Sequence, residues 1–248
     1  MIHLTLIALL QVQAAPHRDV KDPGVIATGQ RVSPAGVQSA FDGKVAGVRF
    51  GRSSDEVWVA APNITYRLDW RANKAIAQTR LNGTPGVFGL TVDRITGRVF
   101  VSSVGRLPAP SATPGAPVVR QPAVTYLSAI APDAHGDSAK PQWQSPALGD
   151  YMAGAPAIAS RKLDDGRRFA AVPLPANDAL AVVDVETGTL SHTIPLGVEP
   201  IAAVISADGR TAYVSILGGP RPTGTQRAAR QCCDIRAEAV RVDARGIA

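Results

Sequence analysis

The stretch ALAVVDVETGTLSHTIPLGVEPIAAVISADGRTAYVSIL, residues 179–217, holds apolar runs separated by short turns. Residues 179–185 are almost wholly apolar, and the Glu-Thr-Gly of residues 186–188 supplies a turn into the next extended run. The pattern restarts at Pro200, which lies 44 residues after the corresponding Pro156. Nearly continuous apolar runs joined by tight turns predict short antiparallel strands in a sheet that is covered on both faces.

A turn followed by an apolar strand with one aromatic side chain recurs along the chain. The aromatic residues of the four copies are Trp58, Phe100, Phe169 and Tyr213, which lie 42, 69 and 44 residues apart. The longest interval contains residues 105–122, whose five prolines exclude a sheet interior, and without this segment the spacing is regular. A period of about 40 to 50 residues with several short strands is the signature of β-propeller blades. We therefore expect the four aromatic residues at equivalent positions of successive sheets.

The repeat predicts an all-β chain: a β-propeller of four-stranded antiparallel blades, present as an incomplete arc of about three to four blades. The expected blades are residues 44–82, 83–149 with the Pro-rich insertion, 150–197, and 198–218 as the start of a fourth. Residues 16–43 form a lead-in segment, and residues 219–248 are an Arg-rich loop of a truncated fourth blade. We expect a fragment of a longer propeller whose open strand edges promote association, because closure normally covers such edges.

Composition agrees with many short strands. The 248 residues are 45% hydrophobic and 19% charged and include 20 prolines and 23 glycines, which disfavours long helices. The net charge is +6, and residues 221–245 alone carry six arginines. Elsewhere the basic residues are scattered singly without interleaved aromatic residues, so we expect a solvated surface and no nucleic-acid partner.

The N-terminus has the pattern of a secretory signal peptide over residues 1–15. Ile2 to Leu10 is a short apolar run, and Val12 and Ala14 fit the small-residue cleavage pattern. The run is too short for a membrane span, which needs about 20 apolar residues. The expected location is therefore periplasmic or secreted.

No side chains gather in a pattern that marks a catalytic, cofactor-binding or metal site, so none is predicted and no cofactor is expected. The histidines are dispersed, acidic residues at turns act first as turn formers, and the tryptophans suit blade cores or rims. These residues are His3, His17, His135 and His192; Asp133, Asp137, Asp164 and Asp165; and Trp58, Trp70 and Trp143. The adjacent Cys232 and Cys233 have no neighbouring ligands that would complete a metal site.

Residues 179–217 resemble the YVTN-type repeat of bacterial seven-bladed propellers. The Ile-Pro-Leu-Gly of residues 194–197 matches the strand end of that repeat. Residues 206–215 match its restart, with Ala207 in place of the usual Pro and Ser215 in place of the usual Thr. Residues 29–51 also resemble the start of secreted propellers that in some proteins precede an alkaline-phosphatase-like phosphoesterase domain. The matched residues specify a scaffold and no chemistry.

Two functions stay open at this point. The first is an exported propeller scaffold that binds a protein partner or small ligand through its loops, with further blades of the same full-length protein as neighbours. The insertions at residues 105–122 and 218–245 would supply those loops. The second is the propeller part of a hydrolase, either lactonase-like or fused to a phosphoesterase domain absent here. We expect no hydrolytic activity from this chain alone.

Overall fold

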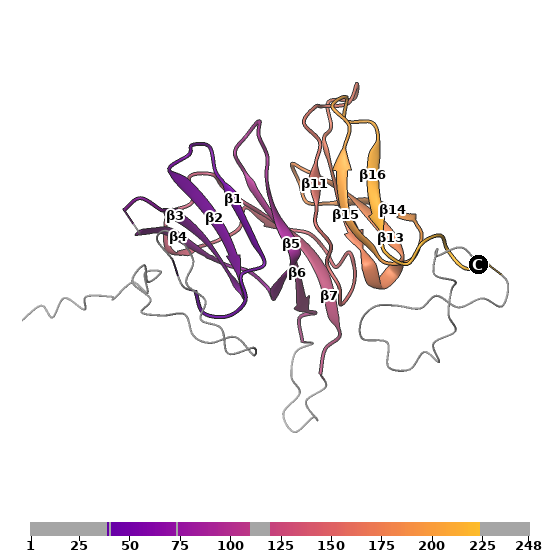
Figure 1. Ribbon diagram of the computed structural model, residues 1–248, viewed down its shortest axis with the longest axis horizontal. Coiled ribbons are helices and arrows are strands. Elements are labelled where there is room, and N and C mark those ends of the chain that lie inside the picture. The colour runs from indigo at the N-terminus through magenta and orange to yellow at the C-terminus, as the bar shows by residue number, and fades with distance from the viewer. Residues whose placement is uncertain (1–38, 40, 73, 110–119, 224–248) are drawn as a thin grey trace, which may run out of the picture.

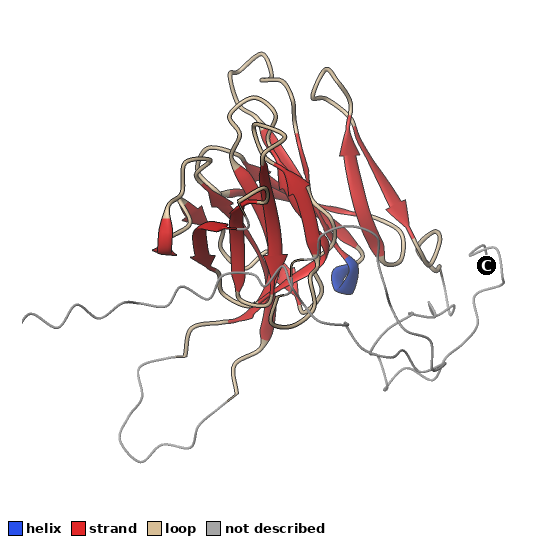
Figure 2. Cartoon of the chain, turned by 60° about the vertical axis from the view of Figure 1, so that its left-hand side comes forward, coloured by secondary structure: helices blue, strands red, loops and turns tan. Residues whose placement is uncertain are grey.

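The computed structural model describes residues 39, 41–72, 74–109 and 120–223. The described chain is all-β, and its sheets follow one another as blades of an open arc (Figure 1). Within these residues the helical content is a single 3-10 turn, η1 (Pro175–Asn177), seen in blue in Figure 2. The expectation of antiparallel blades without substantial helix is confirmed.

The first strands of successive sheets lie side by side along the inner edge of the arc. Blade 1 contains β1 (Gly47–Phe50), β2 (Glu56–Ala61), β3 (Ile64–Asp69) and β4 (Lys74–Arg80). Blade 2 contains β5 (Thr84–Val92), β6 (Val99–Arg106), β7 (Ala123–Ile130), β9 (Trp143–Gln144) and β10 (Gly149–Asp150). Blade 3 contains β11 (Ala157–Ile158), β12 (Phe169–Leu174), β13 (Ala179–Asp184) and β14 (Leu190–Pro195), and blade 4 contains β15 (Pro200–Ile205) and β16 (Ala212–Ile216).

The second repeat departs from the expected four-stranded blade. Its outer edge is split between β9 and β10, which both pair with β7. Between β7 and β9 the chain forms β8 (Gly136–Ala139), which pairs in parallel with β4 of blade 1. Blade 1 therefore has five strands, the last of which comes from the following repeat.

Three of the four repeated aromatic residues occupy equivalent positions. Trp58 lies opposite Arg49, Phe100 opposite Thr91, and Tyr213 opposite Val204, each in the second pair from the turn between the first two strands of its blade. The prediction was wrong for the third blade.

In blade 3 the equivalent residue is Ala171, which lies opposite Ala157. Phe169 is two residues earlier on the same strand. The reason is a longer connection between β11 and β12, which moves the aromatic residue out of register with its counterparts.

The core lies between the blades. Trp58 is fully buried with Val99 and Val101 of blade 2. Phe100 is fully buried against Val172 of blade 3, among the other apolar residues of that interface. Each blade thus covers the apolar face of the one before it, and at the end of the arc the equivalent Tyr213 is 64% exposed.

A buried ion pair joins blades 2 and 3. Arg168 donates two hydrogen bonds to the Asp93 carboxylate, at 3.0 and 2.6 Å, and both side chains are almost fully buried. Burial alone would raise the pKa of Asp93, but hydrogen bonds from Arg168, Thr96 and the backbone N–H of Ile95 outweigh it and hold the pKa below its usual value.

The aromatic positions give a matched pair of substitutions. Trp58→Ala removes a fully buried side chain from the interface between blades 1 and 2, so we expect it to lower the free energy of unfolding by about 3 to 5 kcal/mol. Tyr213→Ala at the equivalent, exposed position should change it by less than about 0.5 kcal/mol. Urea unfolding measures both, and similar losses for the two variants would contradict burial between blades.

Asp93→Asn removes the buried counter-charge of Arg168 and leaves it only the half-exposed Glu186, 3.5 Å away, so we expect it to destabilise the protein by about 3 to 5 kcal/mol. Asp165→Asn, which breaks the exposed pair with Arg167, should have a much smaller effect, because solvent screens that pair.

The dependence of stability on acid pH distinguishes the contribution of this ion pair from that of general packing. Because the pKa of Asp93 is lower in the folded state, its stabilisation is complete above the unfolded-state pKa of about 3.9 and is lost as the pH falls below that value towards the folded pKa. Thermal melts between pH 5 and pH 2 should therefore fall more steeply for the wild type than for Asp93→Asn. Parallel pH profiles would show that Asp93 does not carry this dependence.

Candidate functional site

The inner edge of the arc is hollowed by two adjoining cavities, which together we call the axial hollow. One, of about 730 Å³, lies between blades 1 and 2, and the other, of about 710 Å³, runs along the first strands of all four blades. The two share five residues: Arg49, Thr91, Val92, Asp93 and Arg94. Both volumes are within the range of small-molecule sites, roughly 300 to 1,000 Å³.

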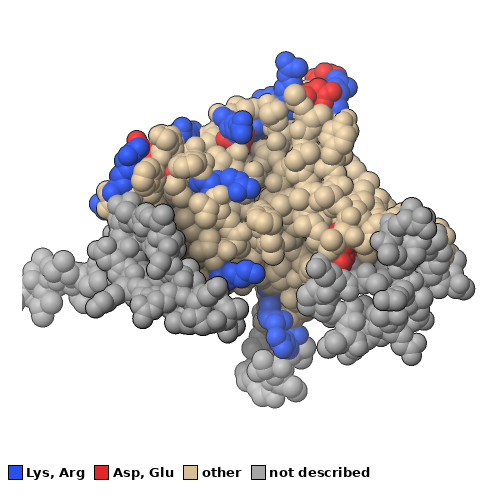
Figure 3. Space-filling view, viewed as in Figure 1, with Lys and Arg blue, Asp and Glu red and all other residues tan. Residues whose placement is uncertain are grey.

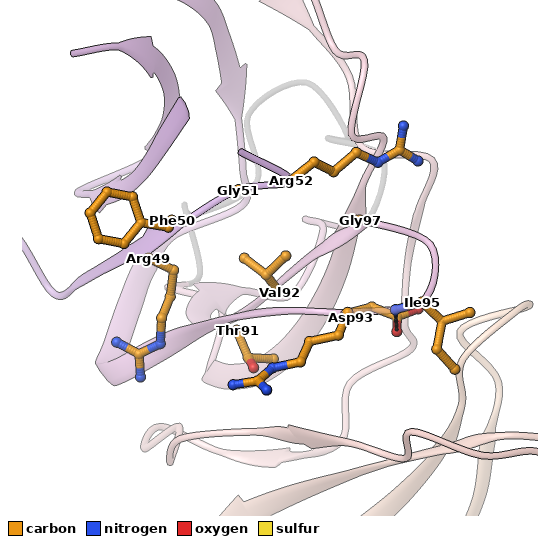
Figure 4. Close-up of a pocket in the computed structure, with 10 residues that line it drawn as sticks. Arg49, Phe50, Gly51, Arg52, Thr91, Val92, Asp93, Ile95 and Gly97 are labelled. Atoms are coloured by element: carbon orange, nitrogen blue, oxygen red, sulfur yellow. Dashed lines mark hydrogen bonds between the residues drawn. The ribbon is translucent and has the colours of Figure 1, made fainter. Parts of the chain in front are cut away.

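Three exposed arginines line the axial hollow. Arg49 lies on β1 opposite Trp58, so its side chain is on the face of blade 1 that looks toward blade 2. Arg52 follows β1 and donates a hydrogen bond to the Thr96 carbonyl. Figure 4 shows that the Arg49 and Arg52 side chains point to opposite ends of the cavity between blades 1 and 2.

Arg94 follows β5 and lines both cavities with Arg49. Arg49 uses one amino group to donate to the Val48 carbonyl at 2.8 Å, and its remaining donors stay exposed. The guanidinium of Arg94 is exposed and forms no ion pair with the other residues that the structure describes. This part of the hollow can therefore supply two guanidinium groups to an anion.

The acidic residue of the hollow does not cancel this positive charge. Asp93 lines both cavities, but its carboxylate accepts the two hydrogen bonds from Arg168 and one from Thr96. Its negative charge is thus already paired within the wall between blades 2 and 3. The exposed charges that face the hollow from the described residues lining it are those of Arg49, Arg52 and Arg94.

Basic residues are not concentrated elsewhere on this side of the molecule. On the face seen in Figure 3 they lie singly over the blades nearer the N-terminus and mix with acidic residues at the turn above β15 and β16. The expectation of a solvated surface without a nucleic-acid partner stays a prediction.

The innermost strand of blade 2 carries an irregularity at the hollow. The pairing of β5 with β6 breaks between Pro85 and Leu90, and the intervening Gly-Val-Phe-Gly stands out of the ladder. Phe88 has a φ of 56°, a left-handed conformation that is rare for an aromatic residue. Its side chain is 60% exposed and lines the cavity along the first strands.

Sequence reasoning missed the axial hollow. The arginines that line it come from blade 1 (Arg49 and Arg52) and blade 2 (Arg94), and no local sequence pattern joins the two groups. The irregularity in β5 could have been predicted, because two glycines that flank two apolar residues inside a strand pattern are typical of a bulge.

Some residues considered from the sequence do meet, at a different place. Asp164, Asp165, Phe169 and His192 line a third cavity, of about 560 Å³, between blades 3 and 4. Asp165 accepts the backbone N–H of Arg167, as a turn former does, and Asp164 pairs with Arg210 at 2.5 Å. His192 lies exposed on the outer strand β14, as expected. Over the described parts of the chain, no group of three His, Cys, Asp or Glu side chains is placed to hold a metal ion.

The tryptophans are core and rim residues. Trp58 is fully buried, Trp143 packs against Phe100 with ring centroids 5.7 Å apart, and Trp70 lies at the rim, where Arg71 stacks on its ring. His135 is exposed on the connection before β8. His3, His17, Cys232, Cys233 and the signal-peptide segment lie outside the described residues, as do residues 110–119 and 224–248 of the two insertions.

Within the described residues, no helix has the length and apolarity needed to cross a membrane.

No family model and no curated protein matches the chain. Solved structures give distant matches to β-propeller-like proteins. A protein of unknown function from Bacteroides caccae superimposes with a TM-score of 0.48 at 11% identity, over 87% of this chain and 69% of that one. A functionally unknown protein from Desulfotomaculum acetoxidans gives 0.47 at 15% identity, over 75% and 52% of the two chains. The β-propeller domain of Myceliophteria thermophila Cps50 (Swd1) gives 0.42 at 12% identity, over 64% and 44%. None of these matches assigns the chain to a family.

Proposed function

We propose that this chain is part of an exported binding scaffold of the YVTN-type propeller class, and that it takes a small organic anion in the axial hollow. The observation that carries the proposal is the exposed pair Arg49 and Arg94, which line both cavities of the hollow. The signal-peptide pattern of residues 1–15 supports export to the periplasm or the exterior.

The physical argument rests on charge. A carboxylate or phosphate gains charge-assisted hydrogen bonds from guanidinium groups, which present several donors in a fixed plane. The neighbouring Asp93 offers no competing free charge, because Arg168 holds it from within the wall. The two insertions expected from the sequence to bind a partner begin at the ends of β6 and β16, the second strands of blades 2 and 4, so this site does not depend on them.

Isothermal titration calorimetry with hexanoate and its neutral counterpart hexanamide tests the proposal. We expect hexanoate to bind and hexanamide to bind at least tenfold more weakly, and we expect the affinity for hexanoate to fall as salt is raised. Arg49→Gln and Arg94→Gln should each weaken hexanoate binding by about tenfold, a loss of about 1.4 kcal/mol, and the double variant should abolish it.

Arg167→Gln is the matched control, since it removes an exposed arginine that pairs with Asp165 away from the hollow. It should leave hexanoate binding unchanged. Equal affinity for the acid and the amide, or equal losses in Arg94→Gln and Arg167→Gln, would overturn the proposal. Turnover of a lactone or a phosphoester by the same preparations would instead favour the hydrolase hypothesis.

A further inference from the structure

The Gly86–Gly89 bulge of β5 presents apolar surface at the place where the axial hollow carries its arginines. Val87 is 56% exposed and Phe88 is 60% exposed. In contrast, Leu90 of the same strand and its partner Val101 on β6 are fully buried. Phe88, Arg49 and Arg94 line the same cavity. An aromatic side chain and two cations therefore line one open cavity.

The bulge is fixed by its surroundings and is not a loose loop. The backbone N–H of Phe88 donates to the Ala46 carbonyl of blade 1 at 2.9 Å. Gly86 lies so close to blade 3 that a Cβ there would be 2.2 Å from the Ala153 carbonyl oxygen, and a Cβ on Gly89 would be 2.8 Å from the Ser102 carbonyl oxygen. Three blades thus hold the four residues in place.

The backbone conformation of Phe88 is unfavourable, and its side chain is not buried enough to compensate for it. A left-handed conformation at a non-glycine residue is unfavourable, and such residues cluster at ligand sites. Phe88 stays mostly exposed, so packing within the described chain does not offset that cost. A ligand that covers the ring would do so.

We infer that the bulge is the apolar half of the binding site, so that the ligand of the axial hollow is an amphipathic anion. Its charged group lies at Arg49 and Arg94, and its alkyl or aromatic body lies against Phe88. This inference rests on the proposed function and adds the class of ligand. The chemistry is that of a medium-chain or aromatic carboxylate, for which a cavity of about 710 Å³ has room.

A series of straight-chain carboxylates tests the inference. We expect calorimetric affinity to rise from acetate through butyrate and hexanoate to octanoate by about two- to fourfold per methylene that reaches the bulge, in keeping with about 0.8 kcal/mol for a fully buried methylene. Octanoate should therefore bind at least tenfold more tightly than butyrate.

Phe88→Asn is the informative variant. Asn adopts left-handed backbone conformations more readily than Phe, so the bulge should be retained while its apolar surface is lost. We expect most of the dependence on chain length to disappear, with butyrate affinity unchanged within twofold. Phe88→Leu should keep the dependence, and Tyr213→Asn, an exposed aromatic that does not line the axial hollow, should leave it intact.

The outcomes separate the two proposals. Equal affinities across the series, or a chain-length dependence that survives Phe88→Asn, would overturn the amphipathic ligand and leave anion binding standing. Failure of every carboxylate to bind would overturn the proposed function itself.

Discussion

The burial of apolar sheet faces between successive blades is the interaction on which the structure depends. In β12, Ala170 and Val172 pack toward blade 2, whereas Ala171 packs toward blade 4. A single blade cannot cover both of its faces, so each is stabilised mainly through its neighbours. Where the described chain ends this sequence of layers, the last sheet keeps apolar side chains in water, among them Val204 and Tyr213.

The same constraint explains where the candidate site lies. Residues between two blades must be apolar or paired, as Asp93 and Arg168 are. Residues of the first strands need not be apolar or paired, because one edge of these strands faces the axial hollow, where charged groups keep access to solvent. Arg49 and Arg94 are tolerated there, and the ion pair behind them neutralises the one carboxylate that would oppose an anion.

The sequence could predict what is local. Gly188, in the turn predicted at residues 186–188, does adopt a positive φ, and the strands between residues 179 and 217 lie close to where the apolar runs place them. Features that depend on distant residues could not be predicted. The pairing of Arg168 with Asp93 joins residues 75 positions apart, and neither the longer connection before Phe169 nor the route of β8 leaves a periodic signal. The site consists mainly of such features, since its arginines come from different repeats.

The second repeat contributes β8 to the sheet of the first repeat, and this has a consequence for biosynthesis. Sheet edges left open during synthesis are prone to wrong pairing, and domains fold as units while the chain emerges from the ribosome. Because β4 receives its outer partner from Gly136–Ala139, blade 1 cannot be completed until most of the next repeat has been translated. The smallest piece of this chain that contains every strand of the first sheet therefore comprises the first two repeats and not one blade.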